Sequence, residues 1–527
     1  MTATKTNALS RALSAAYKRG VDDEMLEPLV LLDEKGNPEG RLQRGDSVIF
    51  YNIRGEREIE LTRSLTERNF GEFPVERDLD LNFATMIEYK KGLPVAVAFP
   101  PEECITDTLS SVIARAGKLQ TKITEAEKAI HLGYFLNGKR SAAEAGEERI
   151  IIATRKDVVL FDEAPRMSID EITENVITKM RDKSRDILIV NYPNVDVVGH
   201  IENRNAVIDA VEAVDEALGI VLEEAEKNNV ISIVTADHGT VEKWYYPDGK
   251  IDTGHTDSPV PFIIVSKDDN LRLRRNGELS DVAPSILHLM GIDIPPAMAG
   301  HSLICGDIEV KKRVLLLILD GWGLGEKGRN NLIYEAKTPV MDRLMSVYPH
   351  SILKASGEAV GLPEKTVGNS EVGHLHIGAG RRIYSDRVRI NRAIAEGSFM
   401  KIEALNKVMD SSILEGSALH LMGIVSFFSS HGSVDHLCAL MEMAKKKGVK
   451  ELYVHAMLGR RGERPESGAL YIEKIEQQCQ KLDLGSVVSV IGRYWSMDRE
   501  ENWNRIEKTY RMLVYGEGTG IPERGSL

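Results

Sequence analysis

Short apolar runs alternate with helix-type patterns along most of the chain. From about residue 84 onward, apolar runs occur at 95–99, 149–153, 187–191, 231–235 and 261–265. Between them lie longer segments in which apolar residues recur every third or fourth position, as in 205–226. The first pattern is typical of buried strands and the second of amphipathic helices. Because the two alternate, we predict an α/β fold with a mostly parallel sheet covered by helices on both faces.

The same alternation returns after residue 388, where strands are expected at 420–426, 451–455 and 486–491. Residues 47–53 read as a further strand. Residues 292–304 look like the end of a domain, yet 314–320 then begins as a first strand would. Candidate site residues lie on both sides of the segment 305–313, so we predict that this segment does not separate independent domains.

The first twenty residues lack acidic side chains and carry Lys5, Arg11, Lys18 and Arg19, which is also typical of a transit peptide. The alternative is an ordinary helix, because Leu9, Leu13, Ala16 and Tyr17 fall on one helical stripe. We prefer the helix.

Composition narrows the class of protein. The 527 residues carry a net charge of −13, which argues against a general binder of nucleic acids or membrane surfaces. The four cysteines are far apart in the sequence, so we expect no disulfide framework and a reducing, cytoplasmic environment. No apolar run approaches the length of a membrane span.

A serine between small residues, in the segment 366–374 with the sequence TVGNSEVGH, is the first candidate for chemistry. Such a segment predicts a tight turn that exposes a nucleophile or a metal ligand, although an ordinary turn is the alternative. Three strand-like runs elsewhere are followed by metal-type ligands: Asp320; Asp196 and His200; and Asp237 with His238. Mixed carboxylate and imidazole ligands suit a divalent ion such as manganese or zinc, whereas a lone histidine is more often a surface or core residue.

These segments resemble the cofactor-independent phosphoglycerate mutases, two-domain members of the alkaline-phosphatase superfamily. The matching stretches are LDGWG at 319–323, GNSEVGH at 368–374, DVVGH at 196–200, TADHG at 235–239 and TGHT at 253–256. Family-like sequence runs through 313–516 and then continues at about 8–304, so the chain is similar to a circular permutant. Residues 1–20 then match an internal helix of the family, and 305–312 would join the family's usual ends.

The resemblance implies two domains, each built from two segments. A phosphotransferase domain would comprise residues 388–527 and 1–83, and a phosphatase-like metal domain residues 309–387 and 84–308. Hinges are expected near 78–86 and 385–390, where closure of the lobes would exclude water.

The resemblance also implies roles for individual residues. Ser370 would be the nucleophile that becomes phosphorylated. One metal ion would be held by Asp320, Ser370, Asp237 and His238, and the other by Asp196, His200 and His255. The substrate groups would be His431, Arg461, Arg493, Arg499, Arg54, Arg57 and Lys128. Guanidinium forks bind phosphate and carboxylate well, and the alternative for each is an ordinary surface salt bridge.

The implied activity is the interconversion of 3-phosphoglycerate and 2-phosphoglycerate through phosphoserine, without 2,3-bisphosphoglycerate, in glycolysis and gluconeogenesis. We expect two divalent ions, Mn²⁺ first and Zn²⁺ or Co²⁺ as alternatives, and a monomer without nucleic-acid or membrane partners. The chain departs from the family at Phe427–Ser430, and Gly462 stands where the family has an aspartate. His376 and Thr240 replace family asparagines. A metallophosphatase, or a mutase acting on another small phosphorylated acid, is therefore the alternative function.

Overall fold

The computed structural model describes residues 8–101, 105–268, 270–306, 308–310, 313–427, 429–459 and 467–523. The chain forms two compact units, each with its own hydrophobic core. The first unit comprises Met1–Pro101 and Arg389–Leu527, and the second comprises Glu102–Val388. No helix in the described ranges is long and apolar enough to cross a membrane.

The second unit is built on an eight-stranded sheet in the order β11-β14-β9-β8-β13-β7-β5-β6. Its strands are β5 (Gln120–Glu125), β6 (Glu147–Ile152), β7 (Ile187–Tyr192), β8 (Ile231–Thr235), β9 (Val260–Val265), β11 (Asn276–Glu278), β13 (Val314–Leu319) and β14 (His350–Lys354), and β10 (Arg272–Leu273) pairs separately with β12 (Ile304–Cys305). Strands β6, β5, β7, β13 and β8 run parallel to one another, and β9 is antiparallel to β8. The predicted α/β class is confirmed for this unit.

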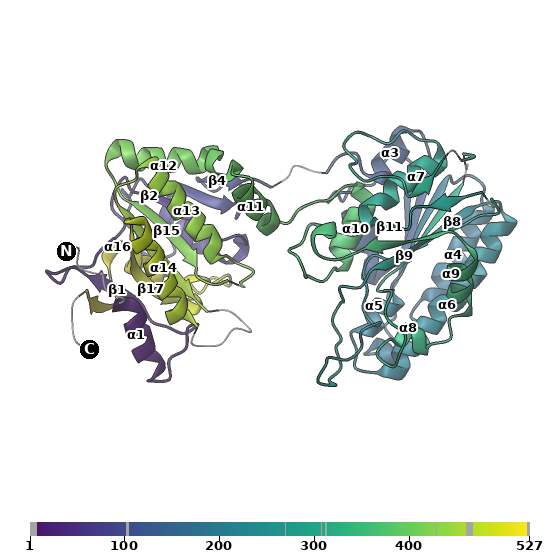
Figure 1. Cartoon of the computed structure of the whole chain (residues 1–527), viewed down its shortest axis with the longest axis horizontal. Coiled ribbons are helices and arrows are strands. Elements are labelled where there is room, and N and C mark those ends of the chain that lie inside the picture. Colours follow the sequence, from purple (N-terminus) through teal and green to yellow (C-terminus); the bar gives the residue numbers. More distant parts are fainter. Residues whose placement is uncertain are drawn as a thin grey trace. The chain divides into compact units, whose positions relative to one another are not determined.

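Helices cover both faces of this sheet. They are α3 (Leu109–Arg115), α4 (Ile169–Arg181), α5 (Asn194–Gly199), α6 (Arg204–Lys227), α7 (Val282–Met290), α8 (Leu332–Glu335), α9 (Pro339–Val347) and α10 (Ser370–Ala379). Figure 1 shows α4, α6 and α9 together on one side of the sheet and α3 and α7 on the other. The central strand β13 is fully apolar and buried because it lies between two parallel neighbours with helices over both faces.

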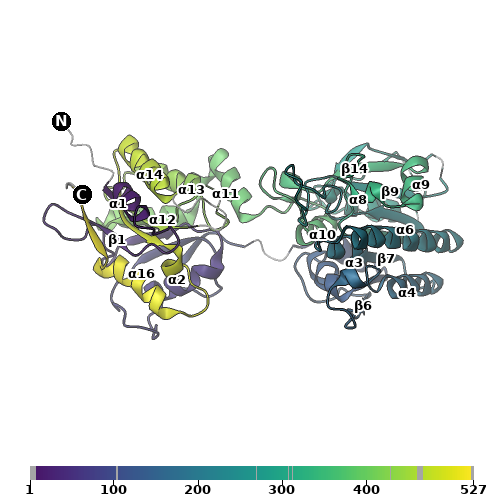
Figure 2. The same ribbon diagram turned by 90° about the horizontal axis from the view of Figure 1, so that it is seen from below.

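The first unit contains a second eight-stranded sheet, in the order β18-β1-β17-β16-β15-β2-β3-β4. Its strands are β1 (Leu29–Leu32), β2 (Ser47–Phe50), β3 (Asn82–Ile87), β4 (Ala96–Phe99), β15 (Leu419–Ile424), β16 (Leu452–Leu458), β17 (Ser486–Gly492) and β18 (Thr519–Pro522). Its helices are α1 (Ala8–Tyr17), α2 (Ile59–Thr66), α12 (Glu403–Glu415), α13 (Val434–Lys447), α14 (Gly468–Leu482), α15 (Arg493–Ser496) and α16 (Trp503–Tyr515), while α11 (Asp386–Ala395) runs from the second unit into the first. In Figure 2, α12, α13 and α14 lie on one side of this sheet and α2 and α16 on the other.

The expected domain change at 83/84 needs correction. Strand β3 contains that position and pairs in parallel with β2, and β4 pairs in parallel with β3. The chain therefore stays in the first sheet until Pro101, and the expected hinge at 78–86 falls in and just before strand β3. The other change of unit, between Val388 and Arg389, falls within the range expected for the second hinge.

The predicted N-terminal helix is confirmed as α1, with Leu9, Leu13 and Ala16 buried. It packs against α14, where Ser10 Oγ donates a hydrogen bond to Glu476 Oε2 at 3.3 Å. Burial, followed by the nearby carboxylate of Glu473, raises the pKa of Glu476 to about 7. The burial of Glu476 therefore makes the stability of the first unit depend on pH.

We expect Glu476→Gln to stabilise the chain at pH 8 and to have little effect near pH 5. A carboxyl group with a raised folded-state pKa favours its neutral form, so stability is lost as pH rises from the unfolded value of 4.5 through about 7. The cost at pH 8 is up to about 3 kcal/mol, at about 1.4 kcal/mol for each pKa unit. Urea unfolding of both proteins at the two pH values measures it, with the exposed Glu72→Gln as control. An equal gain at both pH values would contradict the assignment.

Candidate metal and nucleophile site

The candidate residues of the second unit follow the carboxyl ends of three neighbouring parallel strands. Asp320 follows β13 directly, Asp196 lies in α5 after β7, and Asp237 and His238 follow β8. These strands pair in register, so their carboxyl ends meet at one edge of the sheet, where sites of α/β proteins form. Ser370 is the first residue of α10, and the side chain of Asn369 caps this helix by accepting a hydrogen bond from the Val372 amide at 3.0 Å.

Asp237, His238 and Asp320 form one group of potential metal ligands whose ligand atoms all lie within 4.8 Å of one another. Ser370 joins this group, because its Oγ lies 3.0 Å from His238 Nε2 and donates to Asp320 Oδ1 at 3.2 Å. The structure thus brings together the four residues that the sequence assigned to the first metal. All four are buried.

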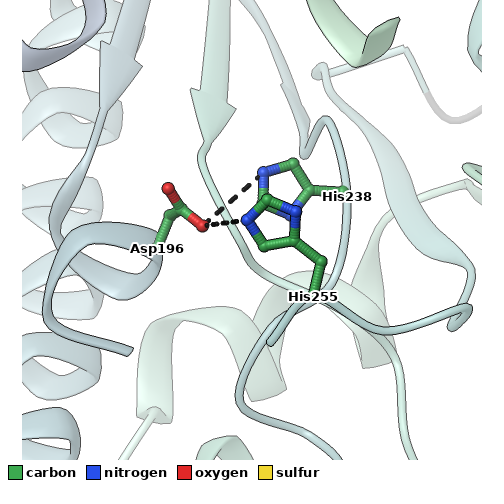
Figure 3. A group of neighbouring side chains, drawn as sticks. All are labelled: Asp196, His238 and His255. Atoms are coloured by element: carbon green, nitrogen blue, oxygen red, sulfur yellow. Dashed lines mark ion pairs between the residues drawn. The ribbon is translucent and has the colours of Figure 1, made fainter. Parts of the chain in front are cut away.

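Asp196, His238 and His255 form the second group. Asp196 Oδ1 lies 3.1 Å from His255 Nε2 and 3.7 Å from His238 Nε2. Dashed lines in Figure 3 mark these two ion pairs. His200, the expected third ligand, is adjacent, with its Nε2 3.3 Å from Asp196 Oδ1 and 3.2 Å from His255 Nε2. The sequence assigned His238 to one ion only, whereas the structure places its imidazole between both groups.

Lys128 supplies positive charge at the centre of the site. Its ammonium donates to Asp196 Oδ2 at 2.6 Å, to Asp320 Oδ1 at 2.8 Å and to Ser370 Oγ at 2.6 Å. Burial alone would lower the pKa of Lys128, but the Asp320 and Asp196 carboxylates outweigh burial and raise it. Lys128 therefore stays charged and favours the alkoxide form of Ser370.

The donor set fits divalent cations. Asp237 Oδ2 is buried and accepts no hydrogen bond among the described residues, although His374 Nδ1 lies 3.2 Å and His238 Nε2 3.5 Å away. A buried carboxylate oxygen without a hydrogen bond is costly unless positive charge lies against it. Burial would lower the pKa of His238, yet the carboxylates of Asp237 and Asp196 raise it to about 10, so the site strongly attracts positive charge. Carboxylate oxygens with imidazole nitrogens are the donors that manganese and zinc share.

Two supporting residues were not predicted from the sequence. Asn191, the fifth residue of β7, donates from Nδ2 to Asp320 Oδ2 at 2.8 Å and lies 3.1 Å from His374 Nε2. His374 Nδ1 lies 2.9 Å from the carbonyl oxygen of Ser370. Both side chains are fully buried, so this pair joins one carboxylate ligand to the backbone of the nucleophile. The sequence signals were the place of Asn191 at the end of the apolar run 187–191 and of His374 at the end of the segment 366–374.

We expect Asn191→Ala to weaken divalent-metal binding by about 10- to 100-fold, as losses of partners that hold metal ligands do. The substitution removes the donor that orients Asp320 and leaves His374 Nε2 without its neighbour. Calorimetric titration of Mn²⁺ into the purified chain measures the effect, and Asn175→Ala in helix α4, whose side chain bonds only to the Glu171 carbonyl of its own helix, is the control. Unchanged Mn²⁺ affinity would refute a positioning role for Asn191.

Glu242 holds the segment that carries His255. Its buried carboxylate accepts hydrogen bonds from the Thr240 amide at 3.0 Å and from Thr256 Oγ1. Gly323 passes so close to this carboxylate that a Cβ atom there would lie 2.3 Å from Glu242 Cδ. The DGWG segment and the loops bearing His238 and His255 are therefore fixed to one another.

The two substitutions for family asparagines lie in different surroundings. Thr240 Oγ1 donates to Asp196 Oδ1 at 3.3 Å and so contacts the ligands directly. His376 Nε2 instead accepts from the Ile383 amide at 3.0 Å, and burial lowers the pKa of His376 to about 4. His376 is thus a neutral imidazole that ties α10 to the following segment.

The expected substrate residues of the first unit follow the carboxyl ends of its parallel strands. Arg54 and Arg57 follow β2, His431 follows β15, and Arg493 and Arg499 follow β17. Glu56 links two of them, since Arg54 Nε and Arg499 Nη1 each donate to it at 2.8 Å, and Arg57 Nη1 donates to the Met497 carbonyl at 2.9 Å. Arg493 is buried, and Arg461 lies outside the described residues.

Comparison with known proteins identifies the family. Residues 25–294 match the model described as "Metalloenzyme superfamily". The chain belongs to this superfamily. Residues 390–524 match the model "BPG-independent PGAM N-terminus". The segment that this model calls an N-terminus follows the metalloenzyme segment here, in agreement with the rotated order.

Individual proteins that the chain matches in part are named as phosphoglycerate mutases. A 2,3-bisphosphoglycerate-independent phosphoglycerate mutase of Moorella thermoacetica is 46% identical over 211 residues, 40% of this chain and 41% of that protein. Its counterpart from Pseudomonas paraeruginosa is 39% identical over 298 residues, 56% of this chain and 57% of that protein. A crystal structure of Leishmania mexicana phosphoglycerate mutase at low cobalt concentration matches at 30% identity and TM-score 0.36, covering 52% and 53% of the two chains. The chain spans about half the length of the curated relatives it matches.

Proposed function

We propose that the protein interconverts 3-phosphoglycerate and 2-phosphoglycerate through phosphorylated Ser370, without 2,3-bisphosphoglycerate. The observation that carries the proposal is the surroundings of Ser370 Oγ, with Lys128 Nζ at 2.6 Å, His238 Nε2 at 3.0 Å and Asp320 Oδ1 at 3.2 Å. A hydroxyl in such surroundings is prepared to act as an alkoxide nucleophile. Family membership and the phosphoglycerate mutase segment support the choice of substrate.

The reaction has two halves in this proposal. Ser370 Oγ attacks the phosphorus of 3-phosphoglycerate, a bond forms between Oγ and phosphorus, and the bond from phosphorus to the 3-oxygen breaks. The 2-oxygen of the same glycerate then attacks the phosphoserine, and Ser370 leaves again as an alkoxide beside the Lys128 ammonium. Two bound divalent ions would stabilise the charge that develops on the phosphoryl oxygens.

The first unit contributes the groups that hold the substrate. Arg54, Arg57, Arg493 and Arg499 bind its phosphate and carboxylate, because guanidinium groups pair with both. We include Arg461 and His431 in this set on the basis of the family motifs. Asp320, Asp237 and His238 would hold one ion, and Asp196, His255 and His200 the other, with His238 adjacent to both.

We extend the proposal to the metal, the oligomeric state and the cellular location. We propose Mn²⁺ as the physiological metal, because the mixed oxygen and nitrogen donors suit it. We also propose that the protein acts as a monomer in the cytoplasm.

Phosphorus NMR of the Mn²⁺-loaded protein with 3-phosphoglycerate, in the absence of bisphosphoglycerate, tests the function. The expected result is a growing 2-phosphoglycerate signal with little inorganic phosphate. Inorganic phosphate without the 2-isomer would instead support the alternative, a metallophosphatase. An unchanged spectrum would refute both activities on this substrate.

A further inference from the structure

A buried carboxylate lies behind the expected substrate histidine of the first unit. Glu58 is fully buried, and its Oε1 lies 3.2 Å from His431 Nδ1. Asn52 Nδ2 donates to the same oxygen at 2.7 Å, and the Arg57 amide donates to Oε2 at 3.1 Å. Since three donors surround it, Glu58 is accommodated as an ionised carboxylate despite its burial.

This arrangement fixes the proton positions on His431. The Glu58 carboxylate can only accept a hydrogen bond, so Nδ1 of His431 must donate it. The neutral ring therefore carries its proton on Nδ1 and presents a lone pair at Nε2. Among the described residues, Nε2 has no hydrogen-bond partner. A histidine held in this way by a carboxylate is suited to take up and release a proton at the opposite nitrogen.

Backbone hydrogen bonds hold Glu58 and His431 beside the segment 53–57, which carries two of the proposed substrate arginines. The His431 carbonyl accepts from the Ile53 amide at 2.7 Å, one residue before Arg54, and the Arg57 amide bonds to Glu58. Asn52 Oδ1 in turn accepts from the Ile424 amide at 2.8 Å, which joins the pair to the end of β15. The imidazole is therefore fixed against the segment that carries two proposed substrate arginines.

We propose that His431 is the catalytic acid and base for the substrate hydroxyls, and that Glu58 is the positioning residue that fixes its ring. This inference rests on the proposed mutase function. In the first half-reaction, His431 enters protonated on both ring nitrogens, and the 3-oxygen receives the proton of Nε2–H as its bond to phosphorus breaks, which leaves the neutral ring with its Nδ1–H held by Glu58. In the second, the 2-hydroxyl gives its proton to Nε2 as the bond from its oxygen to phosphorus forms. The net result is transfer of one proton from the 2-oxygen to the 3-oxygen.

The test compares His431→Gln and Glu58→Gln with the wild-type chain, all loaded with Mn²⁺ and supplied with 3-phosphoglycerate. We expect kcat to fall about 10²- to 10⁴-fold for His431→Gln, the usual range for an acid–base group, and KM to rise by a much smaller factor, because His431 is one of several proposed substrate contacts. Glu58→Gln is expected to lower kcat as well, because an amide cannot accept from all three donors. Nitrogen NMR should show loss of the Nδ1–H tautomer of His431 in Glu58→Gln.

Asp46→Asn is the matched control. Asp46 is another buried carboxylate of the same sheet, and it lies 3.1 Å from His420 Nε2. We expect this variant to lose stability but to retain the kcat of the wild type. An unchanged kcat with a raised KM in His431→Gln would overturn the proposal, as would a wild-type kcat in Glu58→Gln. A wild-type chain without mutase activity would instead show that the proposed function is wrong.

Discussion

Ser370→Ala is expected to abolish phosphoryl transfer, with kcat at least about 10⁴-fold below the wild type, as for loss of other catalytic nucleophiles. The hydroxyl is the acceptor of the phosphoryl group, and no other serine or threonine hydroxyl among the described residues contacts Lys128, His238 and Asp320 together. Binding should persist, because the proposed substrate arginines belong to the first unit.

Two measurements on this variant check the expectation. Phosphorus NMR should show no 2-phosphoglycerate, and calorimetry should show that 3-phosphoglycerate still binds. Ser346→Ala, which alters an exposed serine of α9, is the control and should behave as the wild type. Normal turnover in Ser370→Ala would exclude Ser370 as the nucleophile.

Removal of divalent metal is expected to lower the mutase rate by at least about 10³-fold, with recovery on addition of Mn²⁺. Asp196, Asp237 and Asp320 converge at the edge of the sheet, and the single Lys128 ammonium contacts two of them. Without cations, Asp237 Oδ2 accepts no hydrogen bond among the described residues and has only the ring nitrogens of His374 and His238, at 3.2 Å and 3.5 Å, beside it.

Metal analysis provides a second readout that does not depend on activity. We expect two Mn²⁺ ions per loaded chain, and fewer in Asp237→Asn, whose circular dichroism should match the wild type. The exposed Asp248→Asn is the control. Full activity after exhaustive chelation, or an unchanged metal content in Asp237→Asn, would contradict the assigned site.

The sequence predicted where strands occur along the chain better than it predicted which strands pair with one another. The run 314–319 is buried on both faces, so its apolar pattern identified strand β13 directly. The expected strand at 95–99, which is β4, was assigned to the wrong unit, because an apolar pattern predicts a strand but carries no information on which neighbour it pairs with.

In the candidate metal site, too, local sequence predicted individual residues but not the contacts between them. Asp320, Asp237 and Ser370 could be predicted, since each follows a strand or lies in a glycine-rich segment with recognisable chemistry. The shared position of His238, and the supporting roles of Asn191 and Glu58, depend on contacts between residues far apart in the chain or on which way a buried side chain turns. Such contacts are fixed only by the folded sheet.

A pulse–chase experiment tests the central claim most directly. The Mn²⁺-loaded chain is mixed with 3-phosphoglycerate carrying radioactive phosphate, chased with unlabelled substrate, and quenched at successive times for peptide mapping. The account predicts that label enters the peptide containing Ser370 and leaves it, as 2- and 3-phosphoglycerate, at least as fast as turnover. Label on another residue, no labelled protein during active turnover, or label leaving only as inorganic phosphate would contradict it.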